Sequence, residues 1–123
     1  MSSILVIEDS LHTRRSIREI LEREGYTVSE AEDGLKGLQL ATTETPDCIL
    51  LDLVIPDLDG LKILEGLREL KSGIPVIVIT AHIQKAIRQR CLDLGAAAFI
   101  NKPPNEDELT YAVRKVLGVN KKL

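Results

Sequence analysis

A chain of 123 residues, 44% apolar and 28% charged, has the length and composition of one soluble globular domain with its own core. Its formal net charge of -3 argues against general binding to nucleic acid or to a membrane surface, which requires a basic patch. Cys48 and Cys91 each lie in an apolar run, so we expect buried free thiols, as suits a reducing cytoplasm.

The N-terminus has no basic flank, and no stretch approaches the length that spans a bilayer. We therefore expect a cytoplasmic protein without membrane insertion, in which residues 1–123 form one domain and no output domain is present.

The first elements are a strand, a helix and a second strand. Residues 4–7 form an apolar run typical of a strand. Ser10 can cap a helix that follows, and Gly25 ends it. Residues 26–31 alternate and are rich in β-formers, which predicts the second strand.

The middle of the chain continues this alternation. Residues 35–42 predict a short helix with Leu35 and Leu38 facing inward, and Pro46 opens a third strand at 48–51. The next helix begins after Asp59 and carries apolar positions at helical spacing. They are Leu61, Ile63, Leu64, Leu67 and Leu70.

The last third predicts two more strand and helix pairs. A strand at 75–79 precedes a helix from about 83 to 94, which Gly95 stops. A strand at 96–100 precedes the final helix, which starts at Asn105 or Asp107. Five strands alternating with five helices predict an α/β fold with a parallel sheet and right-handed crossovers.

Side chains that suit phosphoryl transfer stand where predicted strands end. These are Glu8 and Asp9, Asp52, Thr80, and Lys102. In an open parallel sheet, ligands bind at the carboxyl edge of the strands. If the strands are parallel neighbours, three carboxylates, one hydroxyl and one ammonium group meet at that edge.

The carboxylates predict a site for Mg²⁺ or Mn²⁺. Such hard cations favour oxygen ligands, and we expect Asp9 and Asp52 as direct ligands, Glu8 through a water, and the backbone carbonyl of Val54. Three neighbouring negative charges would repel one another without a cation. The ion would let Asp52 attack phosphorus as a nucleophile and become an aspartyl phosphate.

Lys102 and Thr80 suit the phosphoryl group itself. Its equatorial oxygens need fixed positive charge and hydrogen-bond donors, which the ammonium and hydroxyl groups supply. Ala81 is small and would leave the pocket open, and Pro103 could place Lys102 through a cis peptide bond.

With these motifs the chain resembles the response-regulator receiver domain family. The resemblance covers essentially the whole chain, and its motifs in order are Glu8-Asp9, Asp52-Leu-Val-Ile-Pro56-Asp-Leu-Asp-Gly60, Thr80-Ala81 and Lys102-Pro103. It implies a doubly wound five-stranded parallel sheet of flavodoxin or CheY-like type, with strand order 2-1-3-4-5 and helices on both faces.

The resemblance also implies functional roles. Asp52 would be the phosphoacceptor, Glu8 and Asp9 the acidic metal pocket, Thr80 and Phe99 the switch residues, and Lys102 the phosphate ligand. Thr80 and Ala81 would line the phosphate site. The donor would be a phosphohistidine on a sensor histidine kinase or a histidine phosphotransfer protein.

The implied output is a rearranged face formed by the fourth helix, the last strand and the last helix. That face would bind a downstream protein target, which the sequence does not name, rather than nucleic acid directly. The function is then that of a phosphorylation-dependent switch in a two-component pathway or phosphorelay, rather than that of an enzyme with a separate substrate.

Two positions bear on the lifetime of the phosphate. Val54 and His82 lie two residues past the acceptor and the switch hydroxyl, at positions that the resemblance links to phosphate lifetime. Since Val54 cannot orient an attacking water by hydrogen bonding, we predict slow self-dephosphorylation. Phe99 stands where many members of the family have tyrosine, and it lacks the hydroxyl.

Two other functions use the same residues. A small aspartate-nucleophile phosphatase shares the chemistry but needs a water-activating acid, and an adaptor that ignores phosphorylation has no need of the clustered charge. Asp57-Leu-Asp59-Gly60 nearly matches the haloacid-dehalogenase motif, yet Pro56 and Leu61 do not fit it.

The remaining polar residues predict ordinary surface roles. Asp57 and Asp59 are expected to be loop and cap residues, and His12 and His82 lone surface histidines. Five arginines are expected on solvated helix faces, namely Arg14, Arg15, Arg18, Arg88 and Arg90.

Overall fold

The computed structural model describes residues 2–55, 57, 59–70, 73–81 and 84–118. Its sheet has five parallel strands in the order β2-β1-β3-β4-β5, which confirms the predicted fold and order. The strands are β1 (Ser3–Ile7), β2 (Thr27–Ala31), β3 (Cys48–Leu51), β4 (Val76–Thr80) and β5 (Ala98–Asn101).

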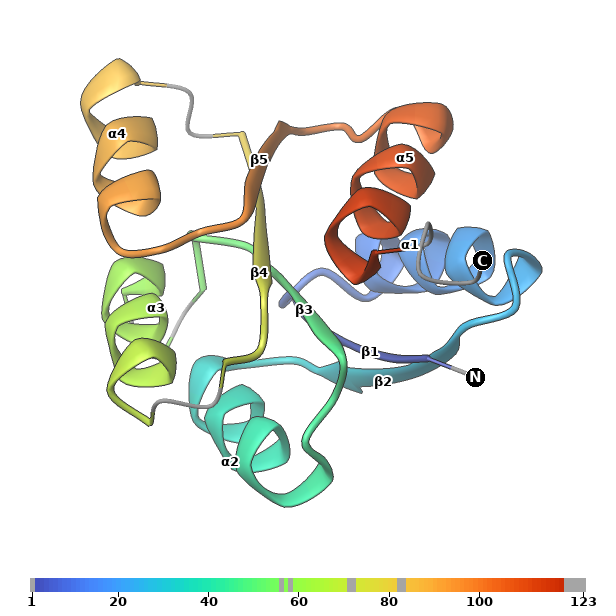
Figure 1. Cartoon of the computed structure of the whole chain (residues 1–123), viewed down its shortest axis with the longest axis horizontal. Helices are drawn as coiled ribbons and strands as arrows, with labels where there is room; N and C mark the ends of the chain where they lie inside the picture. Colours follow the sequence, from blue (N-terminus) through green and yellow to red (C-terminus); the bar gives the residue numbers. More distant parts are fainter. Residues whose placement is uncertain (1, 56, 58, 71–72, 82–83, 119–123) are drawn as a thin grey trace.

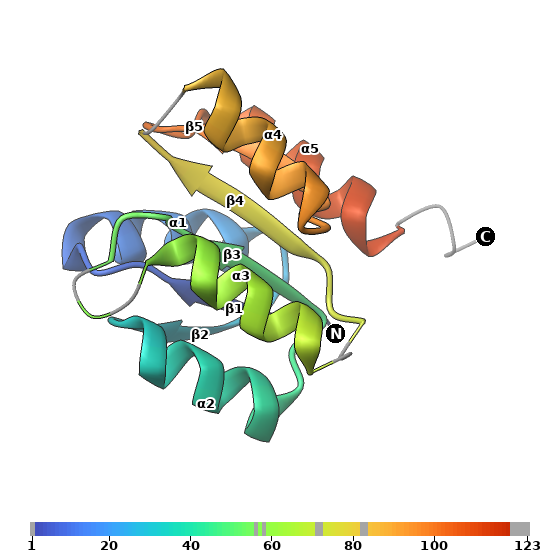
Figure 2. The same cartoon turned by 90° about the vertical axis from the view of Figure 1, so that its left-hand side faces the viewer.

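Helices cover both faces of the sheet. They are α1 (Leu11–Arg23), α2 (Gly34–Glu44), α3 (Gly60–Glu69), α4 (Lys85–Asp93) and α5 (Glu106–Leu117). Helices α1 and α5 lie on one face, and α2, α3 and α4 lie on the other (Figure 1). In Figure 2 the arrowhead of β4 points to the left, so the carboxyl edge of this parallel sheet is on that side.

The apolar runs form strands because both of their faces are buried. Leu5 and Ile7 on β1 belong to the core under α2, α3 and α4. Ile4 and Val6, which alternate with them, belong to the core under α1 and α5. The side-chain period of two along a strand thus divides each run between two hydrophobic cores.

Most predicted helix ends are confirmed. The hydroxyl of Ser10 accepts a hydrogen bond from the Thr13 N–H at 3.2 Å, and a carboxylate oxygen of Asp59 accepts one from the Leu61 N–H at 2.9 Å. Asn105 caps α5, rather than Asp107. Gly25 and Gly95 adopt the positive φ values of 94° and 96° that glycine allows after a helix.

The inward orientation predicted for Leu35 is wrong. Its side chain is 64% exposed, whereas Leu38 packs against the core. Helix α2 turns Gly34, Gly37 and Ala41 toward the sheet. It approaches β1 so closely that a Cβ on Gly37 would lie 2.5 Å from Ile7 Cδ1, so this narrow face leaves Leu35 outside.

Several predicted boundaries differ from the structure by one or two residues. Helix α4 begins at Lys85, and the expected start at Ile83 lies outside the described residues. Strand β5 runs from Ala98 to Asn101 instead of 96–100, because Asn101 pairs with Thr80.

Burial and hydropathy bear on two further expectations. Cys48 and Cys91 are buried free thiols, and burial raises the pKa of Cys48 to about 12, which keeps its thiol protonated. None of the helices in the described part of the chain is both long and apolar enough to cross a membrane.

Candidate functional site

Three carboxylates meet at the carboxyl edge of β1 and β3. The Asp52 N–H donates to the Ile7 carbonyl at 3.0 Å, which continues the pairing of these neighbouring strands past their ends. Glu8, Asp9 and Asp52 each bring one carboxylate oxygen within 4.8 Å of the others. Glu8 is 2% exposed and Asp52 5% exposed, while Asp9 is open to solvent.

Lys102 reaches this cluster from the loop after β5. Its Nζ lies 2.7 Å from Asp52 Oδ2 and 2.5 Å from Glu8 Oε1. The Lys102 N–H donates to the Thr80 carbonyl at 3.0 Å, and the Lys102–Pro103 peptide bond is cis, as predicted. The ammonium group of Lys102 thus holds the carboxylates of Asp52 and Glu8 together.

The pKa directions follow from burial and pairing. Burial raises the pKa of Glu8, and the hydrogen bonds from Lys102 and from the Ser10 N–H only partly offset it. Burial would lower the pKa of Lys102, but the hydrogen bonds to Asp52 and Glu8 outweigh burial and raise it. The lysine therefore stays charged, as its predicted role of phosphate ligand requires.

The second Asp52 oxygen is held by the loop that follows β3. Asp52 Oδ1 accepts a hydrogen bond from the Val54 N–H at 3.1 Å, and Val54 forms an antiparallel bridge with Asp59. The Gly60 N–H donates to the Leu53 carbonyl at 3.1 Å. A Cβ on Gly60 would collide with the Leu53 backbone, so this close approach requires glycine.

Thr80, Ala81 and Phe99 lie along β4 and β5. Thr80 ends β4 and is completely buried, and Ala81 after it is exposed. The half-buried ring of Phe99 lies 5.8 Å from the guanidinium carbon of Arg88 on α4. His82, which was expected to be a surface histidine, lies outside the described residues.

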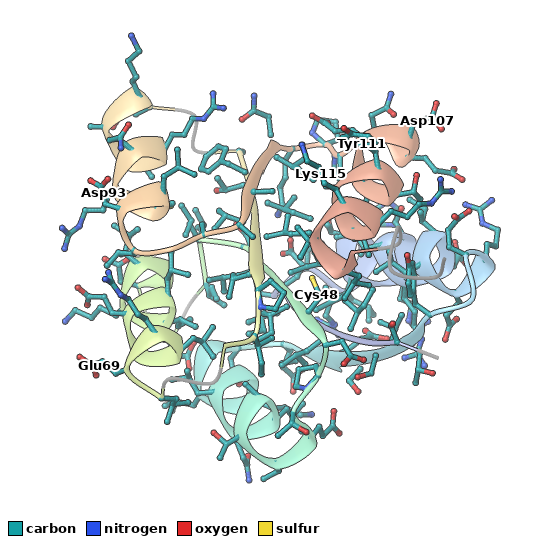
Figure 3. All side chains as sticks on the ribbon, viewed as in Figure 1. Cys48, Glu69, Asp93, Asp107, Tyr111 and Lys115 are labelled. Carbon is teal, nitrogen blue, oxygen red and sulfur yellow. The ribbon has the colours of Figure 1, made fainter. Side chains whose placement is uncertain are left out.

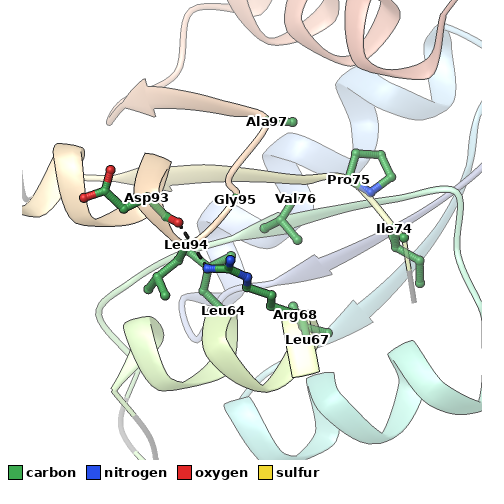
Figure 4. Close-up of a pocket in the computed structure, with 11 residues that line it drawn as sticks. Leu64, Leu67, Arg68, Ile74, Pro75, Val76, Asp93, Leu94, Gly95 and Ala97 are labelled. Carbon is green, nitrogen blue, oxygen red and sulfur yellow. Dashed lines mark hydrogen bonds between the residues drawn. The ribbon is translucent and has the colours of Figure 1, made fainter. Parts of the chain in front are cut away.

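Two hollow surfaces in the described part of the chain lie away from the carboxylates. One of about 690 Å³ is formed between α4, β5 and α5 and includes Phe99, Tyr111 and Lys115. Figure 3 shows Tyr111 and Lys115 on α5. Another of about 420 Å³ lies between α3 and α4 at the amino ends of β4 and β5, where Arg68 Nη1 donates to the Asp93 carbonyl at 3.1 Å (Figure 4).

One arginine expected on a solvated face is instead buried. Arg14 is only 9% exposed, and its Nε lies 2.8 Å from Glu30 Oε1. Arg14 shares a helix face with Ile17 and Leu21, which puts it against the sheet. Its Nη1 donates to the carbonyls of Glu8 and Asp9 at 2.9 Å and 3.3 Å.

Glu30→Gln is expected to lower the free energy of unfolding at pH 7 by about 1 kcal/mol. Hydrogen bonds from Arg18 and Arg14 lower the pKa of Glu30 below its ordinary 4.5 in spite of burial. A group whose pKa is lowered in the folded state stabilises the fold at pH values above its unfolded-state pKa. This stabilisation is lost as the pH falls through the folded-state pKa. Urea unfolding should therefore show the deficit at pH 7 and little of it near pH 3. A deficit that is equal at both values would contradict this account.

The carboxylate of Asp57 caps a helix distant in sequence. Its Oδ1 and Oδ2 accept hydrogen bonds from the Gly34 and Leu35 N–H groups at 2.8 Å and 3.0 Å. Asp33 caps the same helix from within, through the Lys36 N–H at 2.8 Å. The loop after Asp52 is thereby tied to the first turn of α2.

Asp57→Ala should lower the free energy of unfolding by about 1 kcal/mol, the usual loss for a helix cap, because two N–H groups lose their acceptor. Thermal or urea unfolding measures the change. Glu69→Ala, at the exposed end of α3, serves as the control and should change stability little. Equal losses in both variants would exclude a specific cap.

The donor set suits a hard divalent cation. Carboxylate oxygens are the ligands that Mg²⁺ prefers, and the cluster combines two buried groups with one that solvent reaches. Lys102 balances only part of the charge of Glu8, Asp9 and Asp52, so a cation would relieve their repulsion. These three residues therefore fit the metal predicted from the sequence.

Comparisons with known proteins agree with this arrangement. The response regulator receiver domain family matches residues 4–114. Sporulation initiation phosphotransferase F of Bacillus subtilis is 37% identical, over 93% of this chain and 92% of that protein. A CheY-like receiver domain protein of Methanospirillum hungatei JF-1 has a structure similar to this one with a TM-score of 0.93, at 30% identity over 99% of this chain and 98% of that one.

Other relatives are longer. The KDP operon transcriptional regulatory protein KdpE of Escherichia coli is 39% identical over 95% of this chain, which spans 52% of that protein. The chain likewise spans 58% and 49% of the length of two further curated relatives.

Proposed function

This chain belongs to the response regulator receiver domain family, and from that membership and its site we propose that Asp52 accepts a phosphoryl group from a phosphohistidine donor. The proposal is carried by one observation. Lys102 contacts Asp52 and Glu8 at the edge where Asp9 also lies, so a nucleophile, an acidic pocket and a cation for the phosphate occupy one place.

In the proposed transfer, an oxygen of the Asp52 carboxylate forms the new bond to phosphorus. The bond between phosphorus and the donor imidazole nitrogen breaks, and its electron pair stays on that nitrogen, which is then protonated. Lys102, which pairs with the Asp52 carboxylate, would then pair with the negatively charged phosphoryl oxygens. The backbone N–H of Val54 orients the acceptor by holding its other oxygen.

Glu8, Asp9 and Asp52 would hold Mg²⁺ or Mn²⁺, together with the backbone carbonyl of Val54. When bound, the ion offsets the negative charge between the carboxylate and the incoming phosphoryl group. Burial of Glu8 and Asp52 keeps bulk water from screening that interaction.

The switch in this proposal runs from Thr80 to the α4–β5–α5 face. Thr80 is buried at the end of β4, and its hydroxyl would donate to a phosphoryl oxygen while Ala81 leaves room for it. Phe99 lines the hollow between α4 and α5, so a change in its rotamer would reshape that surface. A downstream protein that binds the phosphorylated shape would favour phosphorylation in return.

The proposed partners are a sensor histidine kinase or a histidine phosphotransfer protein as donor, and a protein target for the output face. The expected lack of direct contact with nucleic acid stays a prediction. We propose a switch rather than a phosphatase. A switch gains one phosphoryl group per chain, whereas a phosphatase continues to release inorganic phosphate.

Intact mass after incubation with acetyl phosphate tests the proposal. Wild-type protein should gain one phosphoryl group when Mg²⁺ is present and none when EDTA removes it. Continued release of inorganic phosphate from a phosphomonoester would favour the phosphatase. If neither acetyl phosphate nor a phosphohistidine protein adds phosphate, the proposal is wrong.

The phosphorylated form should lose its phosphate slowly. Val54 lies in the loop that follows the acceptor, with 62% of its surface exposed, and its side chain has no group that could orient water. Val54→Asn should shorten the half-life of the aspartyl phosphate several-fold, measured by intact mass over time. An unchanged half-life would show that this position does not control hydrolysis here.

A further inference from the structure

We propose, on the basis of the proposed metal site, that Arg14 is a positioning residue for it. The guanidinium group holds the backbone of Glu8 and Asp9 and so fixes where their carboxylates stand. Arg14 bonds to these carbonyls and to Glu30, and it acts on the metal site through its neighbours.

The geometry at one end of Arg14 is specific to the acidic turn. A single nitrogen, Nη1, donates to the carbonyls of two consecutive residues, Glu8 at 2.9 Å and Asp9 at 3.3 Å. These carbonyls belong to the peptide planes on either side of the Asp9 Cα, so the arginine limits both backbone torsions of Asp9. Since Asp9 is exposed, the position of its carboxylate depends on this backbone.

The other end of Arg14 is anchored to the sheet. Its Nε lies 2.8 Å from Glu30 Oε1, and the other oxygen of Glu30 lies 2.7 Å from Arg18 Nη1. Glu30 is on β2 opposite Val6, and the Ala31 carbonyl next to it accepts the Glu8 N–H at 3.0 Å. The acidic turn is therefore attached to β2 twice, once by the backbone and once through Arg14.

Stability alone does not account for this arrangement. Arg18 already pairs with Glu30, and a buried ion pair is weak evidence of net stabilisation. Arg14 differs from Arg18 because it also donates hydrogen bonds to the backbone carbonyls of Glu8 and Asp9. Groups that orient metal ligands commonly change metal affinity by about 10-fold or more when they are removed.

The test is a Mg²⁺ titration followed by the amide chemical shifts of residues 8–10 and 52–54, which measures binding without phosphoryl transfer. Arg14→Met should raise the Mg²⁺ dissociation constant by about 10-fold. Arg14→Lys should not restore it, since one ammonium group cannot reach both Glu30 and the two carbonyls. Arg15→Met is the matched control, because Arg15 is the next residue and is exposed, and it should bind Mg²⁺ as wild type does.

Glu30→Gln provides a second route if Arg14→Met does not fold. It keeps the shape of the side chain but weakens the anchor, and it should raise the dissociation constant by less than Arg14→Met. Wild-type affinity in folded Arg14→Met, an equal loss in Arg15→Met, or full rescue by Arg14→Lys would overturn the inference alone. A wild-type protein that binds no Mg²⁺ would overturn the proposed metal site and this inference with it.

Discussion

Asp52→Asn is expected to gain no mass from acetyl phosphate and Mg²⁺ under conditions in which the wild-type protein gains one phosphoryl group. An amide oxygen is a far weaker nucleophile than a carboxylate oxygen, and the substitution also removes one charge from the acidic cluster. The fold should persist, because asparagine has the same shape and can still accept the Val54 N–H.

The matched control for this variant is Asp59→Asn. Asp59 lies in the same loop and caps α3 through the Leu61 N–H, a role that asparagine fills about as well. This control should gain one phosphoryl group as the wild type does. Uptake by Asp52→Asn at the wild-type level would show that another residue is the acceptor, with Asp9 the first to examine because its oxygen lies in the same cluster.

The meeting of Glu8 and Asp52 at one edge could be predicted from the sequence for a simple physical reason. In a parallel sheet the end of each strand lies at one edge, so the order of the strands decides which strand-end residues meet. The apolar runs of β1 and β3 were long enough to identify, and the two strands pair directly. The local sequence pattern of the two strands therefore already indicates that Glu8 and Asp52 are neighbours.

Arg14 shows what was missed although a signal existed. It stands three residues before Ile17 and seven before Leu21, so helical spacing placed it on the buried face. This spacing indicates a buried position, in contrast to the solvated face predicted for Arg14. Its partner could not be read in the same way, because the contact with Glu30 depends on where β2 lies beside β1.

Asp57 and Leu35 show where local pattern carries no signal. The Asp57 carboxylate reaches the first N–H groups of α2 across 22 residues or more of sequence, a contact that only the packed fold defines. Leu35 is exposed because α2 approaches β1 through Gly37, and that closeness depends on the helix and sheet together. Both outcomes come from tertiary packing rather than from propensity.

Lys102→Met is expected to slow phosphoryl uptake by about 100-fold, the usual loss when one group that stabilises transition-state charge is removed. In the proposed transfer, negative charge grows on phosphoryl oxygens beside Asp52, and Lys102 lies 2.7 Å from that carboxylate. The measurement is the rate of mass gain with acetyl phosphate at saturating Mg²⁺. Lys62→Met, which removes an exposed lysine on α3, is the control and should leave the rate unchanged.

The same variant should bind Mg²⁺ more tightly than the wild type. Lys102 occupies oxygens of Glu8 and Asp52 that a metal ion also needs, so the lysine and the ion compete for one cluster. Removing the lysine leaves three carboxylates with less compensation, and their repulsion favours a divalent cation. A lysine that served only to hold the fold together would not produce opposite changes in metal affinity and transfer rate.

The two measurements on Lys102→Met therefore separate its roles. Slower transfer with tighter Mg²⁺ binding would assign the lysine to the phosphoryl group and not to the metal pocket. Slower transfer with weaker Mg²⁺ binding would mean that Lys102 mainly orders Glu8 and Asp52, in which case its contacts at 2.5 Å and 2.7 Å support the pocket instead of competing with the ion. An unchanged transfer rate would remove Lys102 from the proposed chemistry, since the rate then owes nothing to its charge.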